Sequence, residues 1–209
     1  MGDGITTLKN RLGRKASFEE VLLLAKAYEK ANPPIANVIY QIIGTAFPNK
    51  ANEPSVKEAM ADAIDLNENM EQLYKRTYSD SLQRILPDRA KTYIETSEIY
   101  TILLSESDKS PLYLKRSGEL ARTILQFDKA IELYDSVIVN YPDSEEAETV
   151  LFLSAFTFEN DLDNADEARK RYEQFLQKYP DSDFADDVQF LLNNLGKDDA
   201  AILEALQQK

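Results

Sequence analysis

The chain of 209 residues contains no histidine, no cysteine and no tryptophan. Without histidine, neither a Ser-His-Asp triad nor a Cys-His pair can be built. The absence of both thiols and imidazoles also excludes zinc fingers, thiolate-bound clusters and the usual catalytic zinc site. Disulfides are impossible, so cysteine usage leaves the redox compartment open. Only carboxylates, lysine, tyrosine and oxygen-ligated metals could perform chemistry. We therefore expect a non-enzymatic protein without a cofactor.

Basic residues are scarce, because 24 Lys and Arg stand against 37 Asp and Glu, which gives a net charge of −13. The imbalance is uneven: residues 1–60 hold 8 basic and 6 acidic side chains, whereas residues 61–209 hold 16 and 31. An acidic surface disfavours binding to nucleic-acid phosphates and to anionic lipid. We therefore expect a protein or peptide partner and no nucleic acid.

Long hydrophobic runs are absent as well. The longest uncharged stretch has a mainly apolar part, residues 35–47, of 13 residues. A membrane-spanning helix needs roughly 20, so this stretch predicts a buried helix and no direct membrane span. Met1 is followed by Gly-Asp-Gly rather than by a basic and then an apolar segment, and we expect any lipoprotein signal to lie upstream of these residues.

The first 54 residues predict a helical hairpin with a flexible start. Ser17 and Glu20 have the spacing of a capping box, and apolar residues recur at helical spacing behind them. Pro33-Pro34 is expected to end this helix, and a second apolar stripe follows. The stripe consists of Ile35, Val38, Ile39, Ile42 and Ile43. Residues 47–54 predict a loop, and a basic run before the hairpin predicts a solvated terminus. The run consists of Lys9, Arg11, Arg14 and Lys15.

From residue 55 onward the pattern predicts further helices. Ser55 and Glu58 match a second capping box. Apolar residues then step by three and four along one predicted helix face until Pro87, and another helix is expected over residues 88–104. The face consists of Met70, Leu73, Tyr74, Tyr78, Leu82, Ile85 and Leu86.

The most informative feature is an internal repeat with a shift of 38 residues, a period typical of helical arrays. The repeated positions are Ala130, Tyr134, Tyr141-Pro142-Asp143-Ser144 and Ala147, and then Ala168, Tyr172, Tyr179-Pro180-Asp181-Ser182 and Ala185. The alanine allows two helices to approach closely, and the tyrosine fills the space beside it. The proline ends a helix, and the Asp-Ser pair is expected to cap the next one. Gly196 is predicted to terminate a further helix.

These positions resemble the tetratricopeptide repeat (TPR), whose helix pairs carry small and aromatic residues at fixed places. The matching residues are Leu114, Gly118, Phe127, Ala130, Tyr134 and Pro142 in one unit, and Leu151, Ala155, Phe158, Ala168, Tyr172 and Pro180 in the next. Ala121 stands where the family has an aromatic. More narrowly, the linkers and the segment 158–162 resemble cell-envelope TPR lipoproteins of Bacteroidetes-type bacteria, related in style to outer-membrane assembly and Tol-Pal-associated proteins.

The resemblance covers residues 88–209 and implies an all-α, right-handed solenoid of helical hairpins. Together with the N-terminal hairpin, this divides the chain into residues 1–54 and a TPR-like domain over residues 55–209. The clearest units are residues 111–144 and 148–182, followed by C-terminal capping helices over residues 184–207. The implied location is the periplasm or the outer membrane, as a lipoprotein; the cytoplasm is the alternative.

In the TPR family the binding groove lies on the first helix of each pair. Carried over, the partner-binding groove holds Leu112, Lys115, Glu119, Arg122, Phe152, Phe156 and Phe190. The clamp that binds chaperone tails needs asparagine where Glu119 stands, so that function is not expected. Phe152 and Phe156 are either aromatic anchors for a partner or core residues that pack on Phe190 or under the N-terminal hairpin.

Two other kinds of site can be weighed. Asp161, Asp163 and Asp166 do not complete a calcium loop, because Ala165 and Tyr172 occupy positions that need oxygen ligands, so no metal is expected. No pair of carboxylates is singled out for hydrolysis. The sequence favours a non-enzymatic scaffold that binds a peptide or protein on a concave face, in bacterial envelope assembly or maintenance. The alternatives are an envelope enzyme or glycan-binding factor acting on the cell wall through carboxylates, and a structural homo-oligomer.

Overall fold

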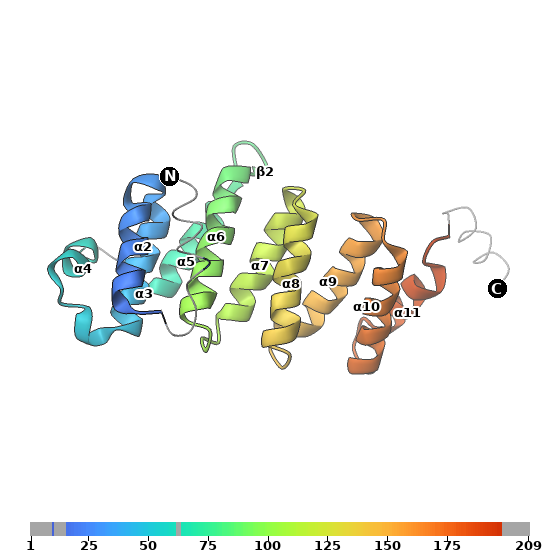
Figure 1. The fold of residues 1–209 in the computed structure, drawn as a ribbon. Helices are drawn as coiled ribbons and strands as arrows, with labels where there is room; N and C mark the ends of the chain where they lie inside the picture. Colours follow the sequence, from blue (N-terminus) through green and yellow to red (C-terminus); the bar gives the residue numbers. More distant parts are fainter. Residues whose placement is uncertain (1–9, 11–15, 62–63, 198–209) are drawn as a thin grey trace. The chain divides into compact units, whose positions relative to one another are not determined.

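The computed structural model describes residue 10 and residues 16–61 and 64–197, which form α-helices almost throughout (Figure 1). The predicted all-α fold of successive helical hairpins is confirmed. The chain divides into two compact units, residues 1–124 and 125–209. The predicted basic run at the start and the part of the predicted C-terminal capping helices beyond residue 197 lie outside the described residues.

The first unit begins with the helical hairpin of α2 (Phe18–Ala31) and α3 (Pro33–Ala46). The predicted capping box is confirmed, since Glu20 N donates to Ser17 Oγ at 3.3 Å and Ser17 N donates to the Glu20 carboxylate at 2.9 Å. Pro33 separates the two helices because a proline lacks the N–H that a helix interior needs but fits its first turn. The apolar stripe of α3 is fully buried, as predicted.

No helix in the described part of the chain is both long and apolar enough to cross a membrane.

The segment after α3 is less regular. It contains the 3₁₀ turn η1 (Pro48–Lys50), the short α4 (Pro54–Ala59) and α5 (Leu66–Lys75). The predicted capping box at Ser55 is wrong: Pro54 takes the first helical position, so Ser55 lies inside the helix, and the cap residue Glu53 makes no side-chain cap bond. α5 is capped by Asp65, whose Oδ1 accepts from Asn67 N at 2.9 Å.

The predicted helix through residue 86 is also wrong, because α5 ends at Lys75 and a small hairpin follows. Its strands β1 (Tyr78–Ser79) and β2 (Arg84–Ile85) pair antiparallel. Thr77 Oγ1 donates to Tyr74 O at 2.8 Å at the helix end, and Gln83 adopts a left-handed φ of 50° in the turn. The apolar residues assigned to the helix face are therefore not all buried: Leu82 is 55% exposed.

α6 (Pro87–Leu103) and α7 (Ser110–Thr123) complete the first unit. α6 begins within one residue of its predicted start. It packs on α3, α5 and α7. Tyr28 OH of α2 donates to the Glu95 carboxylate of α6 at 2.5 Å, and the rings of Tyr100 and Tyr113 meet edge to face at 4.9 Å. Contacts between residues far apart in sequence thus hold this unit together.

The second unit contains α8 (Phe127–Asn140), α9 (Glu146–Asn160), α10 (Ala165–Lys178) and α11 (Ala185–Asn194). α9 packs on α8 and α10, and α10 packs on α11. The repeated alanine and tyrosine inside the second helix of each pair are fully buried, as their spacing predicted; they are Ala130, Tyr134, Ala168 and Tyr172. Tyr172 OH also donates to the Glu159 carboxylate of α9 at 2.6 Å.

The two Tyr-Pro-Asp-Ser linkers have the same geometry. Tyr141 N and Tyr179 N close the preceding helices with bonds of 2.9 and 2.8 Å to carbonyl oxygens. The prediction that Asp-Ser caps the next helix is wrong, since the cap residues are Glu145 and Phe184 and neither makes a side-chain cap bond. The reason is a turn in which each serine N–H donates back to the linker tyrosine, so the helix starts later.

Two side-chain hydrogen bonds hold the segment around the second linker. Lys178 Nζ donates to the carbonyl oxygen of Pro142 in the first linker at 2.7 Å, and Ser182 Oγ donates to the Glu148 carboxylate of α9. The predicted glycine at the end of α11 is confirmed, because Gly196 follows the cap residue Leu195 with a φ of 79°.

Candidate functional site

Four of the predicted groove residues lie along one face of α7. Leu112, Lys115, Glu119 and Arg122 recur at three- and four-residue spacing, and all four are half-buried. Most of the other α7 residues are directed into the first unit, apart from the half-buried Arg116 and the exposed Thr123. The buried residues of α7 are Ser110, Pro111, Tyr113, Leu114, Ser117, Gly118, Leu120 and Ala121. The α7 groove face, as we call these four residues, is therefore a strip of α7 that packing within the unit leaves incompletely covered.

The α7 groove face combines one apolar side chain with charges of both signs. Burial raises the pKa of the Glu119 carboxyl above its ordinary value, although the positive charges of Lys115 and Arg116 act in the opposite direction. Lys115 makes no hydrogen bond or ion pair with a described residue. Its neighbour Arg116 differs, since it bonds to the Glu71 carboxylate of α5 and lies 4.5 Å from the centre of the Tyr74 ring. Lys115 thus remains available to a partner, whereas Arg116 stabilises the fold.

The aromatic residues predicted for the groove lie in the second unit. Phe152 and Phe156 are one turn apart on α9, with ring centres 6.1 Å apart. The Phe152 ring also contacts Phe175 at 6.4 Å and stacks on Phe184 at 5.9 Å. Phe190 of α11 is 44% exposed and makes no ring contact with a described residue. The structure thus brings Phe152 and Phe156 together, while the seven predicted residues fall into two sets, one in each unit.

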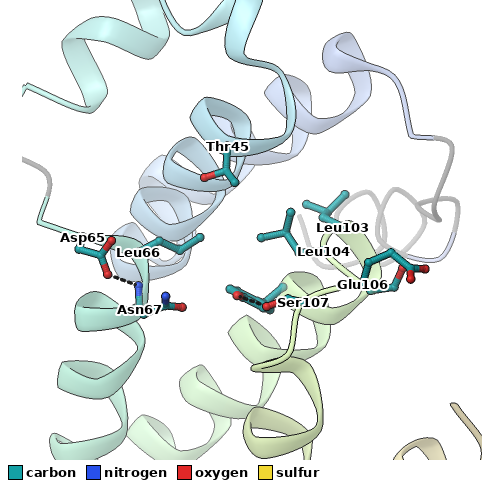
Figure 2. Close-up of a pocket in the computed structure, with 10 residues that line it drawn as sticks. Thr45, Asp65, Leu66, Asn67, Leu103, Leu104, Glu106 and Ser107 are labelled. Atoms are coloured by element: carbon teal, nitrogen blue, oxygen red, sulfur yellow. Dashed lines mark hydrogen bonds between the residues drawn. The ribbon is translucent and has the colours of Figure 1, made fainter. Parts of the chain in front are cut away.

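The first unit also contains a cavity of about 590 Å³ that the sequence analysis did not predict (Figure 2). It lies at the end of α3, the start of α5 and the end of α6 with the loop that follows. Its lining consists of Thr45, Asp65, Leu66, Asn67, Tyr100, Leu103, Leu104, Ser105, Glu106 and Ser107. The volume is within the range of small-ligand sites. Because the lining comes from three separate segments and belongs to no motif, no sequence pattern could have indicated it.

Some of the polar groups that line this cavity form hydrogen bonds with one another. Figure 2 shows Asp65 bonded to the backbone of Asn67, where it caps α5. The hydroxyl groups of Tyr100 and Ser107 lie 2.9 Å apart. Leucine side chains provide an apolar surface beside these groups. The cavity can therefore accept an apolar side chain with a polar end, although it holds no pair of groups with an evident catalytic arrangement.

The acidic loop between α9 and α10 is a helix-capping structure. Asn164 accepts a hydrogen bond from Glu167 N at 3.1 Å, and Asp163 adopts a left-handed φ of 49°. Among the residues that the structure describes, no group of three or more carboxylate side chains lies close enough to hold a metal ion.

Comparison with known proteins identifies the family. The model of the family named YfiO, described as an outer membrane lipoprotein, matches residues 67–204. The match begins in α5 and includes both repeats of the second unit, whereas α2, α3 and α4 precede it. No curated protein matches the chain. Because the family model covers more than half of its residues, the chain belongs to the YfiO family of outer membrane lipoproteins.

Proposed function

We propose that this protein is a non-enzymatic scaffold that binds another protein or a peptide during bacterial outer-membrane assembly or maintenance. Membership of an outer membrane lipoprotein family supports this location. Stacked helical hairpins support binding rather than catalysis, because such folds present extended surfaces instead of a closed reaction chamber. The proposal includes a location in the periplasm or at the outer membrane. It also includes the finer resemblance to Bacteroidetes-type lipoproteins that are related in style to Tol-Pal-associated proteins.

The observation that carries the proposal is the α7 groove face. Leu112 is half-buried there, Lys115 has no ion-pair partner among the described residues, and the Glu119 carboxyl is partly desolvated. A peptide lying along this face would bury the remaining surface of Leu112 and place a carboxylate beside Lys115. We also assign Phe156 and Phe190 of the second unit to partner contacts, as the family resemblance implies, but not Phe152, whose ring is covered by Phe184.

Capture of partners from an envelope extract tests the α7 groove face. Lys115→Glu should reduce the captured amount of the main partner about fivefold or more, because it places a like charge where the partner's carboxylate would bind. Lys26→Glu, on the exposed surface of α2, makes the same charge change in the same unit and should leave capture unchanged. Circular dichroism of both variants controls for folding.

Two results would contradict the proposal. Equal capture by wild type, Lys115→Glu and Lys26→Glu would exclude the α7 groove face. Retention of cell-wall glycan fragments, without any protein that depends on Lys115, would instead support the glycan-binding alternative.

A further inference from the structure

The last described helix of the second unit repeats a surface that is covered on the helix before it. A shift of 38 residues places Glu148 and Phe152 of α9 onto Asp186 and Phe190 of α11. In both helices the acid and the aromatic are four residues apart and lie on one side. Neighbouring positions repeat as well, since Val150 and Val188 share this shift and are both fully buried. The environments of the two helices can therefore be compared residue by residue.

On α9 this surface is covered by the linker that leads to α11. Ser182 Oγ donates to the Glu148 carboxylate, and the ring of Phe184 stacks on Phe152 at 5.9 Å with an interplanar angle of 16°. The serine and the phenylalanine belong to one turn, because Ser182 Oγ also accepts from Phe184 N at 3.0 Å. The acid-and-ring surface of α9 thus binds a turn with a hydroxyl group and, two residues later, an aromatic ring.

On α11 the equivalent surface is open. Asp186 is exposed and Phe190 is 44% exposed. Neither side chain makes a hydrogen bond, an ion pair or a ring contact with a described residue. The neighbouring Asp183 and Asp187 are exposed and equally without an ion pair among these residues. α11 therefore carries both groups that α9 uses to hold the turn, and both are unoccupied by the described chain.

We propose that the face of α11 formed by Asp186 and Phe190 binds a basic turn of a partner protein, which presents a hydroxyl donor to Asp186 and an aromatic ring to Phe190. The geometry of the occupant follows from the turn seen on α9. Its charge follows from the second unit, where residues 125–209 hold 20 acidic and 7 basic side chains. The turn on α9 carries Asp181 and Asp183 but belongs to the same chain, whereas a separate partner has to approach this acidic unit from solution, which lysine or arginine beside its serine would favour.

This inference rests on the proposed scaffold function, because it assigns the chemistry of one partner contact. It uses different residues from the α7 groove face, so the two can fail separately. If the probe failed to bind α11 while partner capture still depended on Lys115, only the inference about α11 would be overturned. If the probe bound α11 but capture did not depend on Lys115, only the assignment of the α7 groove face would be overturned.

The probe is the peptide Tyr-Pro-Lys-Ser-Lys-Phe, which copies residues 179–184 with lysine in place of both aspartates. It is titrated into the full-length, ¹⁵N-labelled chain, and amide chemical shifts report where it binds. We expect shifts concentrated in α11. Phe190→Ala should weaken binding about fivefold, since it removes the ring contact. Asp186→Asn should weaken it about threefold, since it removes a charged hydrogen-bond acceptor.

A matched control separates contact from general charge. Asp187→Asn removes the same charge from the same helix turn, but its equivalent on α9, Thr149, makes no hydrogen bond to the linker. Binding to Asp187→Asn should therefore stay close to wild type, and a probe with serine in place of phenylalanine should bind about fivefold more weakly, since it lacks the same ring contact. Equal weakening by Asp186→Asn and Asp187→Asn, or the absence of shifts in α11, would overturn the proposal.

Two other occupants are distinguished by further measurements. The substitutions Ile202→Asp and Leu206→Asp in the full-length chain should leave probe binding unchanged; a gain of about fivefold or more would show that residues 198–209 occupy the face and would overturn the proposal. Light scattering should give the same mass for wild type and Phe190→Ala. A wild-type dimer that Phe190→Ala converts to a monomer would assign the face to a second copy and would also overturn it.

Discussion

The two units of this protein reach stability in different ways. Residues 1–124 hold 17 basic and 17 acidic side chains, whereas residues 125–209 hold 7 and 20. In the first unit, α3 is packed against α2, α5 and α6, so distant parts of the sequence share one core. In the second, α8 to α11 pack mainly on their neighbours in the chain. Packing between helices that follow one another in the chain can thus hold together the strongly acidic second unit. The first unit, whose positive and negative charges are equal in number, depends on contacts between segments distant in sequence.

Core truncation should show this difference most strongly. Phe175→Ala in α10 and Ile39→Ala in α3 both remove fully buried side chains and should lower the free energy of unfolding by about 3–5 and 2–5 kcal/mol. Hydrogen exchange should accelerate mainly in α9, α10 and α11 for Phe175→Ala, because contacts there are local. For Ile39→Ala it should accelerate across α2, α3, α5 and α6. If hydrogen exchange accelerated equally through the whole chain in both variants, the proposed difference between the two units would be contradicted.

The tyrosine–glutamate hydrogen bonds allow a finer comparison. Tyr172→Phe removes the donor to Glu159 and should cost about 1–2 kcal/mol, because the carboxylate loses its bond beside a buried ring. Tyr28→Phe should cost less, since Glu95 of α6 has a further interaction within the protein. Urea unfolding of the two variants measures the difference. A larger loss for Tyr28→Phe would reverse the expected order.

Two arginines test the influence of the surrounding charge. Arg116 and Arg171 each lie over an aromatic ring and pair with a carboxylate, in the first and the second unit respectively. Replacing either by methionine should cost about 1 kcal/mol. Arg171→Met should lose more stability than Arg116→Met at low salt, because it removes a positive charge from the acidic unit, and added NaCl should restore part of that loss. The same salt dependence for both variants would count against a role for unit charge.

The smallest expected effect concerns Glu119. Burial raises its pKa above the ordinary 4.5, so the folded protein holds this proton more tightly than the unfolded chain does. The ionised carboxylate is therefore destabilising above the folded pKa, and this cost disappears as the pH falls below 4.5. Glu119→Gln should raise Tm at pH 7 by on the order of 1–2 °C and give no gain at pH 4. An equal gain in Tm at pH 7 and pH 4 would exclude ionisation of Glu119 as the cause.

Much of the helical fold could be predicted because its signals are local. The Ser17–Glu20 capping box and the repeated alanine and tyrosine positions each specify their neighbours within a few residues. The 38-residue repeat gave the helix pairs of the second unit in the same way. The hairpin at residues 78–85 was missed, because its apolar spacing also fits a helix and only Thr77 and the turn at Gln83 interrupt it.

The candidate site was less predictable. The pattern on α7 placed four residues on one face correctly, since helical spacing alone fixes that relation. It could not show that Arg116 pairs with Glu71, because their contact joins helices distant in sequence. The cavity in the first unit depends on three segments that meet only in the folded state. The sequence alone reveals local patterns but does not reveal which distant segments lie close together in the folded protein.

The bonds between the linkers have a consequence for how this protein could lengthen. Lys178 reaches the Pro142 carbonyl one repeat earlier, and Ser182 reaches Glu148 within its own repeat. A tandem duplication of residues 145–182 would therefore recreate both bonds, since Pro180 would take the place of Pro142 for the new lysine. A single duplication could therefore add a whole repeat that keeps both of these linker contacts.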